Sequence, residues 1–171
     1  FTDMCIALLA AEGKLSLDDD IRTHVPEVSA YGETITIRHL IHHTSGLRDM
    51  WDLLRLAGWR DDDLITEADM LWVVSRQQAL NFRPGDEYLY SNTGYALLAL
   101  IVHRVNGRTL REFADERIFA PLGMTRTHVH DDHTEIVVGR TQAYEPTKGG
   151  GLRVSIPVFD VAGTTSLFTT V

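Results

Sequence analysis

The chain has 171 residues, of which 44% are hydrophobic and 23% charged, and its formal net charge is −8. This composition is close to the average of globular proteins and excludes wholesale disorder and low-complexity architecture. The negative charge and the presence of only two lysines, Lys14 and Lys148, argue against binding to nucleic acid. No apolar run approaches the roughly 20 residues of a membrane span. The single cysteine, Cys5, excludes an internal disulfide.

The sequence opens directly on an apolar helical pattern. Hydrophobic side chains recur at helical spacing from Phe1 to Leu9, Gly13 is a suitable terminator, and no capping residue precedes Phe1. Residues 166–171 are strand-like and lack a polar tail. We therefore expect residues 1–171 to be a partial domain from a longer protein. Apolar helix faces that have lost their packing partners would then be exposed, which predicts self-association.

Signals for helices dominate the middle of the chain, where each predicted helix has a polar cap or a Gly or Pro stop. These signals are Thr36 with a stop at Thr44-Ser45-Gly46, Thr66 in a capping box with Asp69, Ser91 or Asn92 with Gly107, and Thr109 in a capping box with Glu112 before Pro121.

The pattern changes beyond Met124. Short β-like runs occur at residues 137–138, 153–158 and 167–171, and they are separated by Gly149-Gly150-Gly151 and other turn residues. The sequence thus predicts an α+β fold that is mostly helical, with short strands in its C-terminal quarter.

Tyr90-Ser91-Asn92 is the first candidate functional site. It places a phenol and an amide at the start of a predicted helix, just after the Pro84-Gly85 turn. A helix N-terminus presents side chains to solvent and adds partial positive charge. From these residues alone, capping by Ser91 or Asn92 and packing of Tyr90 is the favoured interpretation.

The run from Phe82 to Tyr95 resembles the second motif of the serine β-lactamase and penicillin-binding protein superfamily. Tyr-x-Asn replaces Ser-Asp-Asn in its class C β-lactamase and esterase branch. Residues 12–19, 35–47 and 118–124 are similar to further stretches of that family, in the same order and at similar spacing. The resemblance therefore covers nearly the whole chain.

This resemblance implies acyl transfer at a site between a helical domain and an α/β sheet domain, without a cofactor. The substrate would be an amide or ester: a β-lactam, a D-amino-acid peptide or a simple ester. Tyr90 would be the general base, and Asn92 would hold the amide or carbonyl oxygen of the substrate. A family-derived binding protein without catalysis is an alternative.

Two motifs of that family are missing from the 171 residues. No serine has a lysine three residues later, so the nucleophilic Ser-x-x-Lys motif, expected just before Phe1-Thr2, is absent. The third motif, Lys-Thr-Gly or His-x-Gly, is absent too. Thr147-Lys148-Gly149 has a different order and is interpreted as a turn. The chain on its own is therefore expected to be inactive.

Two groups of histidines suggest metal binding. The string from His128 to His133 fits the His-x-His-x-Asp-His pattern of zinc hydrolases, with ligands His128, His130, Asp132 and His133. No histidine follows it to complete such a site, so we favour a solvated polar loop and expect no metal, with a zinc hydrolase as an alternative. His39, His42 and His43 are interpreted as satisfied histidines at a helix end.

Overall fold

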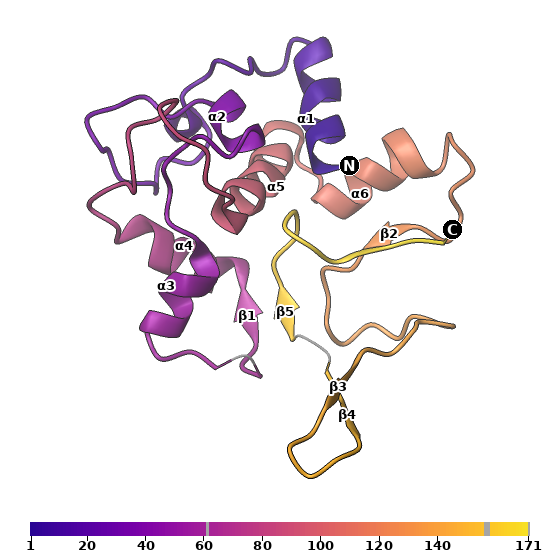
Figure 1. Cartoon of the computed structure of the whole chain (residues 1–171). Helices are drawn as coiled ribbons and strands as arrows, with labels where there is room; N and C mark the ends of the chain where they lie inside the picture. Colours follow the sequence, from indigo (N-terminus) through magenta and orange to yellow (C-terminus); the bar gives the residue numbers. More distant parts are fainter. Residues whose placement is uncertain (61, 156–157, 171) are drawn as a thin grey trace.

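The computed structural model describes residues 1–60, 62–155 and 158–170. Figure 1 shows the helices gathered around α5, with the short strands on the other side of the molecule. The helices are α1 (Thr2–Ala11), η1 (Ile21–Thr23), α2 (Ile37–Ile41), α3 (Met50–Leu56), α4 (Glu67–Ser75), α5 (Asn92–Asn106), α6 (Leu110–Ala114) and η2 (Asp115–Phe119). The strands are β1 (Ile65–Thr66), β2 (His128–Val129), β3 (Tyr144–Pro146), β4 (Leu152–Val154), β5 (Phe159–Asp160) and β6 (Leu167–Phe168).

The α5 helix is the centre of the fold. Almost every residue from Thr93 to Val102 is buried, and a helix that is apolar on all sides must be covered on all sides. α1, α2, α3 and α6 all pack against it. Gly94 allows the close approach of α2, since a Cβ there would lie 3.3 Å from the backbone oxygen of Leu40.

Three predicted helix caps are confirmed. Thr36, Thr66 and Thr109 each accept a hydrogen bond from the backbone N–H three residues later, in a full capping box. The prediction for α5 is wrong in its detail. Ser91 occupies the cap position, but its side chain makes no capping hydrogen bond. The carboxylate of Asp49 accepts the N–H of Asn92, the first residue of the helix.

The stretch after α2 differs from the prediction. α2 ends at Ile41, and Gly46 is not the end of a helix. Gly46 has a φ of +72°, and a Cβ there would lie 2.2 Å from the backbone oxygen of Phe82, so the position requires glycine. The chain then enters α3, which was not predicted, at its N-cap Asp49.

The strands form three separate pairs. β1 pairs with β5 in parallel, β2 with β6 antiparallel, and β3 with β4 as an antiparallel hairpin. The α+β class is confirmed, and Thr147-Lys148-Gly149 lies in the hairpin turn as predicted.

The boundaries of the predicted strands fit less well. β4 and β6 overlap two of the predicted runs, whose residues 156–157 and 171 lie outside the described residues. Residues 137–138 form no strand, and Val138 is 96% exposed. β2 falls where a polar loop was expected, because Val129 and His130 are buried against the rest of the fold.

Two further features concern the surface. Among the described residues, no helix combines the length and apolarity needed to cross a bilayer. Phe1 and Met4 of the first helical turn are about half exposed. Self-association through this surface stays a prediction.

The requirement for glycine at position 46 can be tested by comparing Gly46→Ala with Gly32→Ala. Gly32 also has a positive φ (+78°), but a Cβ there meets nothing within 4 Å. We expect Gly32→Ala to lower the free energy of unfolding by about 1–2 kcal/mol, from backbone strain alone. Gly46→Ala should lower it by about 2–5 kcal/mol, since overpacking adds to strain. Urea unfolding measures both, and equal losses would contradict the close contact with Phe82.

Candidate active site

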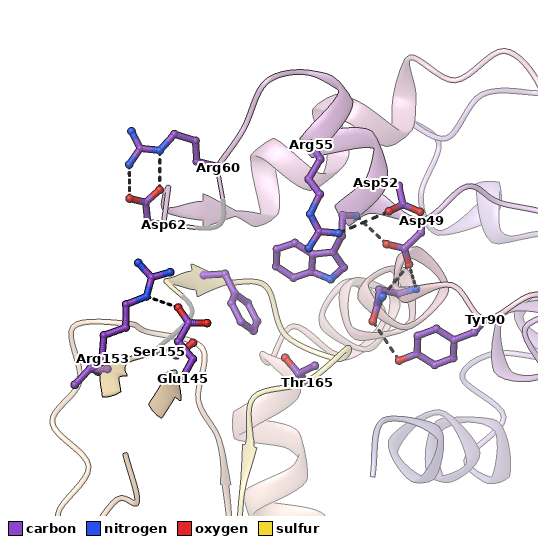
Figure 2. Close-up of a pocket in the computed structure, with 14 residues that line it drawn as sticks. Asp49, Asp52, Arg55, Arg60, Asp62, Tyr90, Glu145, Arg153, Ser155 and Thr165 are labelled. Carbon is purple, nitrogen blue, oxygen red and sulfur yellow. Dashed lines mark hydrogen bonds and ion pairs between the residues drawn. The ribbon is translucent and has the colours of Figure 1, made fainter. Parts of the chain in front are cut away.

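Tyr90 and Asn92 line a cleft of about 1060 Å³. Its walls come from α3, from the segment before β1, from the β3–β4 hairpin and from β5. Figure 2 shows Tyr90 and Asp49 on one side of the cleft and Glu145 and Arg153 on the opposite side. Protein pockets that bind small molecules typically have volumes of about 300–1,000 Å³, so this cleft is large enough for a substrate.

The two residues predicted from the sequence are in contact. The hydroxyl of Tyr90 donates a hydrogen bond to Oδ1 of Asn92 over 3.2 Å. Tyr90 remains 55% exposed, so its oxygen is accessible from the cleft. A phenol that is hydrogen-bonded to an amide oxygen at the N-terminus of a helix can bind and polarise a polar group of a substrate.

Asp49 holds this pair in place, and the sequence analysis missed it. Its Oδ2 accepts hydrogen bonds from the backbone N–H of Asn92 (2.6 Å) and from Nδ2 of the same residue (2.8 Å). Its Oδ1 accepts from the backbone N–H of Trp51 over 2.9 Å and so caps α3. One carboxylate therefore serves the N-termini of both α3 and α5, where free N–H groups and partial positive charge favour an anion.

The carboxylate also decides which way the amide of Asn92 points. An ionised carboxylate only accepts hydrogen bonds, so Nδ2 of Asn92 must face Asp49. Oδ1 is then left to face Tyr90 and the cleft. Asp49 could have been found from the sequence as the residue before an apolar run, Met50 to Leu54, but that signal predicts only a cap.

His43 supports the tyrosine from the other side. Its ring lies 4.6 Å from the ring of Tyr90 and stacks on Tyr95 at 5.0 Å, between centroids. Its Nδ1 accepts a hydrogen bond from the backbone N–H of Ser91 over 3.2 Å. The backbone of His43 is left-handed, with φ 55°, a conformation in which histidine is enriched among non-glycine residues. The prediction of a satisfied helix-end histidine thus holds for this ring.

The neighbouring phenol of Tyr95 is unsuited to act as a base. Its hydroxyl donates to Oδ2 of Asp3 over 2.7 Å. Burial, reinforced by this carboxylate, raises the pKa of Tyr95 far above its ordinary value. Tyr90, by contrast, is exposed and donates its hydrogen bond to the neutral amide of Asn92.

Other residues that line the cleft form ion pairs and an aromatic contact. Trp51 and Phe159 meet edge to face with their centroids 5.3 Å apart. Arg60 is bonded to Asp62, and Arg153 to Glu145. The cleft therefore offers an apolar contact beside charges of both signs.

Neither lysine of the chain is placed to assist Tyr90. Lys14 forms an ion pair with Glu12 over 2.9 Å, at the far end of α1 from Phe1. Lys148 lies in the β3–β4 turn, and neither residue lines the cleft.

The residues of the histidine string from His128 to His133 do not lie together in the structure. The structure brings His128 and His130 together, with their ring centroids 5.8 Å apart. Asp132 accepts hydrogen bonds from Thr134, while His133 contacts Asp160. A carboxylate oxygen of Glu135 lies within 4.8 Å of a ring nitrogen of each of the first two histidines. The expectation of a solvated loop is therefore wrong for the first half of the string, where His130 is only 7% exposed, whereas Asp132 and His133 are exposed.

Comparison with known proteins identifies the family. Residues 1–169 match the family described as Beta-lactamase. The chain belongs to the Beta-lactamase family. That Tyr90 and Asn92 are the Tyr-x-Asn motif of this family stays a prediction.

Individual relatives agree with this assignment. Penicillin-binding protein 4* of Bacillus subtilis is 34% identical over 132 residues, which cover 77% of this chain and 29% of the relative. The D-aminopeptidase of Brucella anthropi is 34% identical over 129 residues, which cover 75% and 24%. The octameric penicillin-binding protein homologue from Pyrococcus abyssi has a TM-score of 0.83 at 26% identity, over 99% of this chain and 40% of that one. The chain thus spans about a quarter of the length of the two curated relatives.

The role of Asp49 predicts a loss of stability in Asp49→Ala. The substitution removes the cap of α3 and leaves the first N–H of α5 without its acceptor. We expect the free energy of unfolding to fall by about 2–4 kcal/mol. Asp52→Ala, which removes the same charge from the exposed side of α3, should change it by no more than about 0.5 kcal/mol. Urea unfolding compares the two, and equal effects would mean that charge rather than bridging matters.

We expect His43 to make the free energy of unfolding depend on pH. Burial lowers the pKa of His43 below its ordinary value of 6.5, and protonation of Nδ1 would remove the acceptor of the Ser91 N–H. Below about pH 6.5 the unfolded chain therefore binds a proton that the folded chain does not, and stability falls as the pH is lowered. Above that pH, His43 contributes no slope.

His43→Asn should remove this part of the profile. The difference in unfolding free energy between the wild type and His43→Asn is expected to be constant above pH 6.5 and to shrink below it. His42→Asn, at an exposed neighbour, is the control. A difference that stays constant down to pH 5 would contradict the argument.

Proposed function

We propose that this chain supplies the Tyr-x-Asn half of the active site of a serine hydrolase that acts by acyl transfer on an amide or ester. The observation that carries the proposal is the hydrogen-bonded series Tyr90–Asn92–Asp49 at the wall of a substrate-sized cleft. Membership of the Beta-lactamase family supports it. The nucleophilic serine and its lysine would come from outside this chain.

In this mechanism, the serine oxygen attacks the carbonyl carbon of the substrate and forms an acyl-enzyme. Tyr90 takes part as the general base for the serine proton, which then passes to the leaving amine or alcohol. Water attacks the acyl-enzyme in the second half and restores the serine.

Asn92 would position the substrate. Its Oδ1, directed away from Asp49, can accept a hydrogen bond from an amide N–H of the substrate, and the free hydrogen of Nδ2 can be donated to a carbonyl oxygen. Because Asp49 fixes the orientation, no rearrangement of the amide is needed when substrate binds.

D-amino-acid amides and peptides are the first substrates to test. A D-aminopeptidase is among the relatives at 34% identity, and the cleft combines the Trp51–Phe159 contact with charged side chains that suit a short peptide. β-Lactams and simple esters are the other members of the proposed class.

The 171-residue chain alone is expected to show no turnover of these substrates. None of its serines is followed by lysine at the required spacing, and loss of a nucleophile leaves only residual acceleration. A fluorophosphonate probe should therefore label no serine stoichiometrically. Stoichiometric labelling, located by mass spectrometry, would contradict the assignment of the nucleophile to a missing segment.

The role of Tyr90 can be tested in a polypeptide extended upstream of Phe1 by reading the preceding codons. If that extension carries Ser-x-x-Lys, Tyr90→Phe should lower kcat about 10²–10⁴-fold, as expected for loss of a general base. Tyr88→Phe, an exposed tyrosine two residues away, should retain activity. An extension without Ser-x-x-Lys would favour the non-catalytic binding protein instead.

A further inference from the structure

His128, His130 and Glu135 form a second group of chemically competent side chains, away from the cleft. A ring nitrogen of each histidine and a carboxylate oxygen of Glu135 all lie within 4.8 Å of one another. His128 and His130 are two residues apart on and just after β2, so both rings project from the same face of the strand. None of the three residues lines the cleft that holds Tyr90.

Two ring nitrogens in this group are buried and unpartnered. His128 Nε2 and His130 Nδ1 are inaccessible to solvent and make no hydrogen bond to any described residue. His130 as a whole is only 7% exposed, and its Nδ1 lies 3.7 Å from Oε2 of Glu135. A buried polar atom without a partner costs free energy. This cost, repeated at two adjacent nitrogens beside a carboxylate, indicates a ligand that binds all three.

The surrounding residues fix the rings and the carboxylate. Phe168 of β6 stacks on His128 (centroids 5.7 Å apart) and meets His130 edge-on at 5.3 Å. Arg111 of α6 holds Glu135 through two hydrogen bonds of 2.6 and 2.8 Å and also contacts Asp131. Metal ligands are typically oriented by such outer contacts.

We propose that His128, His130 and Glu135 bind one divalent transition-metal ion, with zinc as the best-suited candidate. Two imidazole nitrogens and one carboxylate oxygen are a ligand set that zinc accepts, with an open fourth position. The ligand atoms would need to approach to about 3.3 Å of one another for a tetrahedral site, which side-chain rotation can supply. The ion would tie β2 to the residue that α6 holds through Arg111, and because it binds the folded chain it would raise the free energy of unfolding.

This site differs from the zinc hydrolase pattern of the sequence. Asp132 and His133 take no part in it, because they are bonded to Thr134 and Asp160. Nor does the site depend on the proposed acyl-transfer function, since it shares no residue with the cleft.

The contact between Arg140 and His130 affects how His130 can bind the metal ion. Its Nη1 lies 3.3 Å from Nε2 of His130, and a guanidinium can only donate, so that nitrogen is the acceptor in the metal-free chain. A ring that binds metal through Nδ1 carries its proton on Nε2. The contact with Arg140 must therefore open when the ion binds. Arg140→Gln, which removes a positive charge and offers a carbonyl oxygen to Nε2–H, should bind zinc more tightly than the wild type.

Titration calorimetry of the 171-residue chain with zinc chloride tests the proposal. We expect one ion per chain, with a rise in Tm of about 5–10 °C when free zinc is near 100 times Kd. His128→Ala and Glu135→Gln should each weaken binding about 10-fold or more. His133→Ala and His42→Ala should bind as the wild type does. Circular dichroism of the metal-free variants shows whether each is folded.

A second readout does not depend on variants. The ¹⁵N chemical shifts of the imidazoles should report zinc on Nε2 of His128 and Nδ1 of His130, with no change at His133. The proposal is overturned if the wild type does not bind zinc below millimolar concentration. It is also overturned if His133→Ala weakens binding as much as His128→Ala, or if the shifts place the ion on other histidines.

Discussion

The carboxylate of Asp49 is the interaction on which the arrangement of the site depends. Two helices, α3 and α5, begin within reach of it, and each would otherwise leave backbone N–H groups unsatisfied. Three donors converge on the two oxygens of this one side chain. The contact joins segments 43 residues apart in the sequence, and it fixes the start of the central helix and the amide of Asn92 together.

The orientation of Tyr90 follows from this constraint. Because Nδ2 of Asn92 is engaged by Asp49, its Oδ1 is directed to the tyrosine hydroxyl. The ring of His43 then packs against the face of Tyr90 while its Nδ1 receives the N–H of Ser91. The phenol is thus held by one polar and one aromatic contact, and its hydroxyl still faces the cleft. Such prior organisation lowers the cost of reaching a reactive geometry.

Local signals in the sequence were sufficient for some elements and not for others. The caps at Thr36, Thr66 and Thr109 were predicted correctly because each partner lies three residues away. The hydrogen bond from the first N–H of α5 to Asp49 was not predicted, because Asp49 belongs to a distant segment. The same limit explains Gly46, where the backbone of Phe82 leaves no space for a Cβ, a contact that no local pattern reveals.

The candidate sites show the same division. Tyr90 and Asn92 could be recognised because the motif is contiguous, whereas Asp49 and His43 required the fold. In the histidine string, the structure brings only His128 and His130 together among the four residues of the zinc hydrolase alternative. The expectation of a solvated loop was wrong for these two histidines. The chain turns after Asp131 and brings Glu135 to the two rings in place of Asp132 and His133.

A double-mutant cycle between Asp49 and Asn92 tests the central claim most directly. Unfolding free energies of Asp49→Ala, Asn92→Ala and the double variant give the coupling between the two side chains. If the carboxylate and the amide act as one unit, the coupling should be about 1–3 kcal/mol. A coupling within about 0.3 kcal/mol of zero would show that the two side chains act independently and would contradict this account.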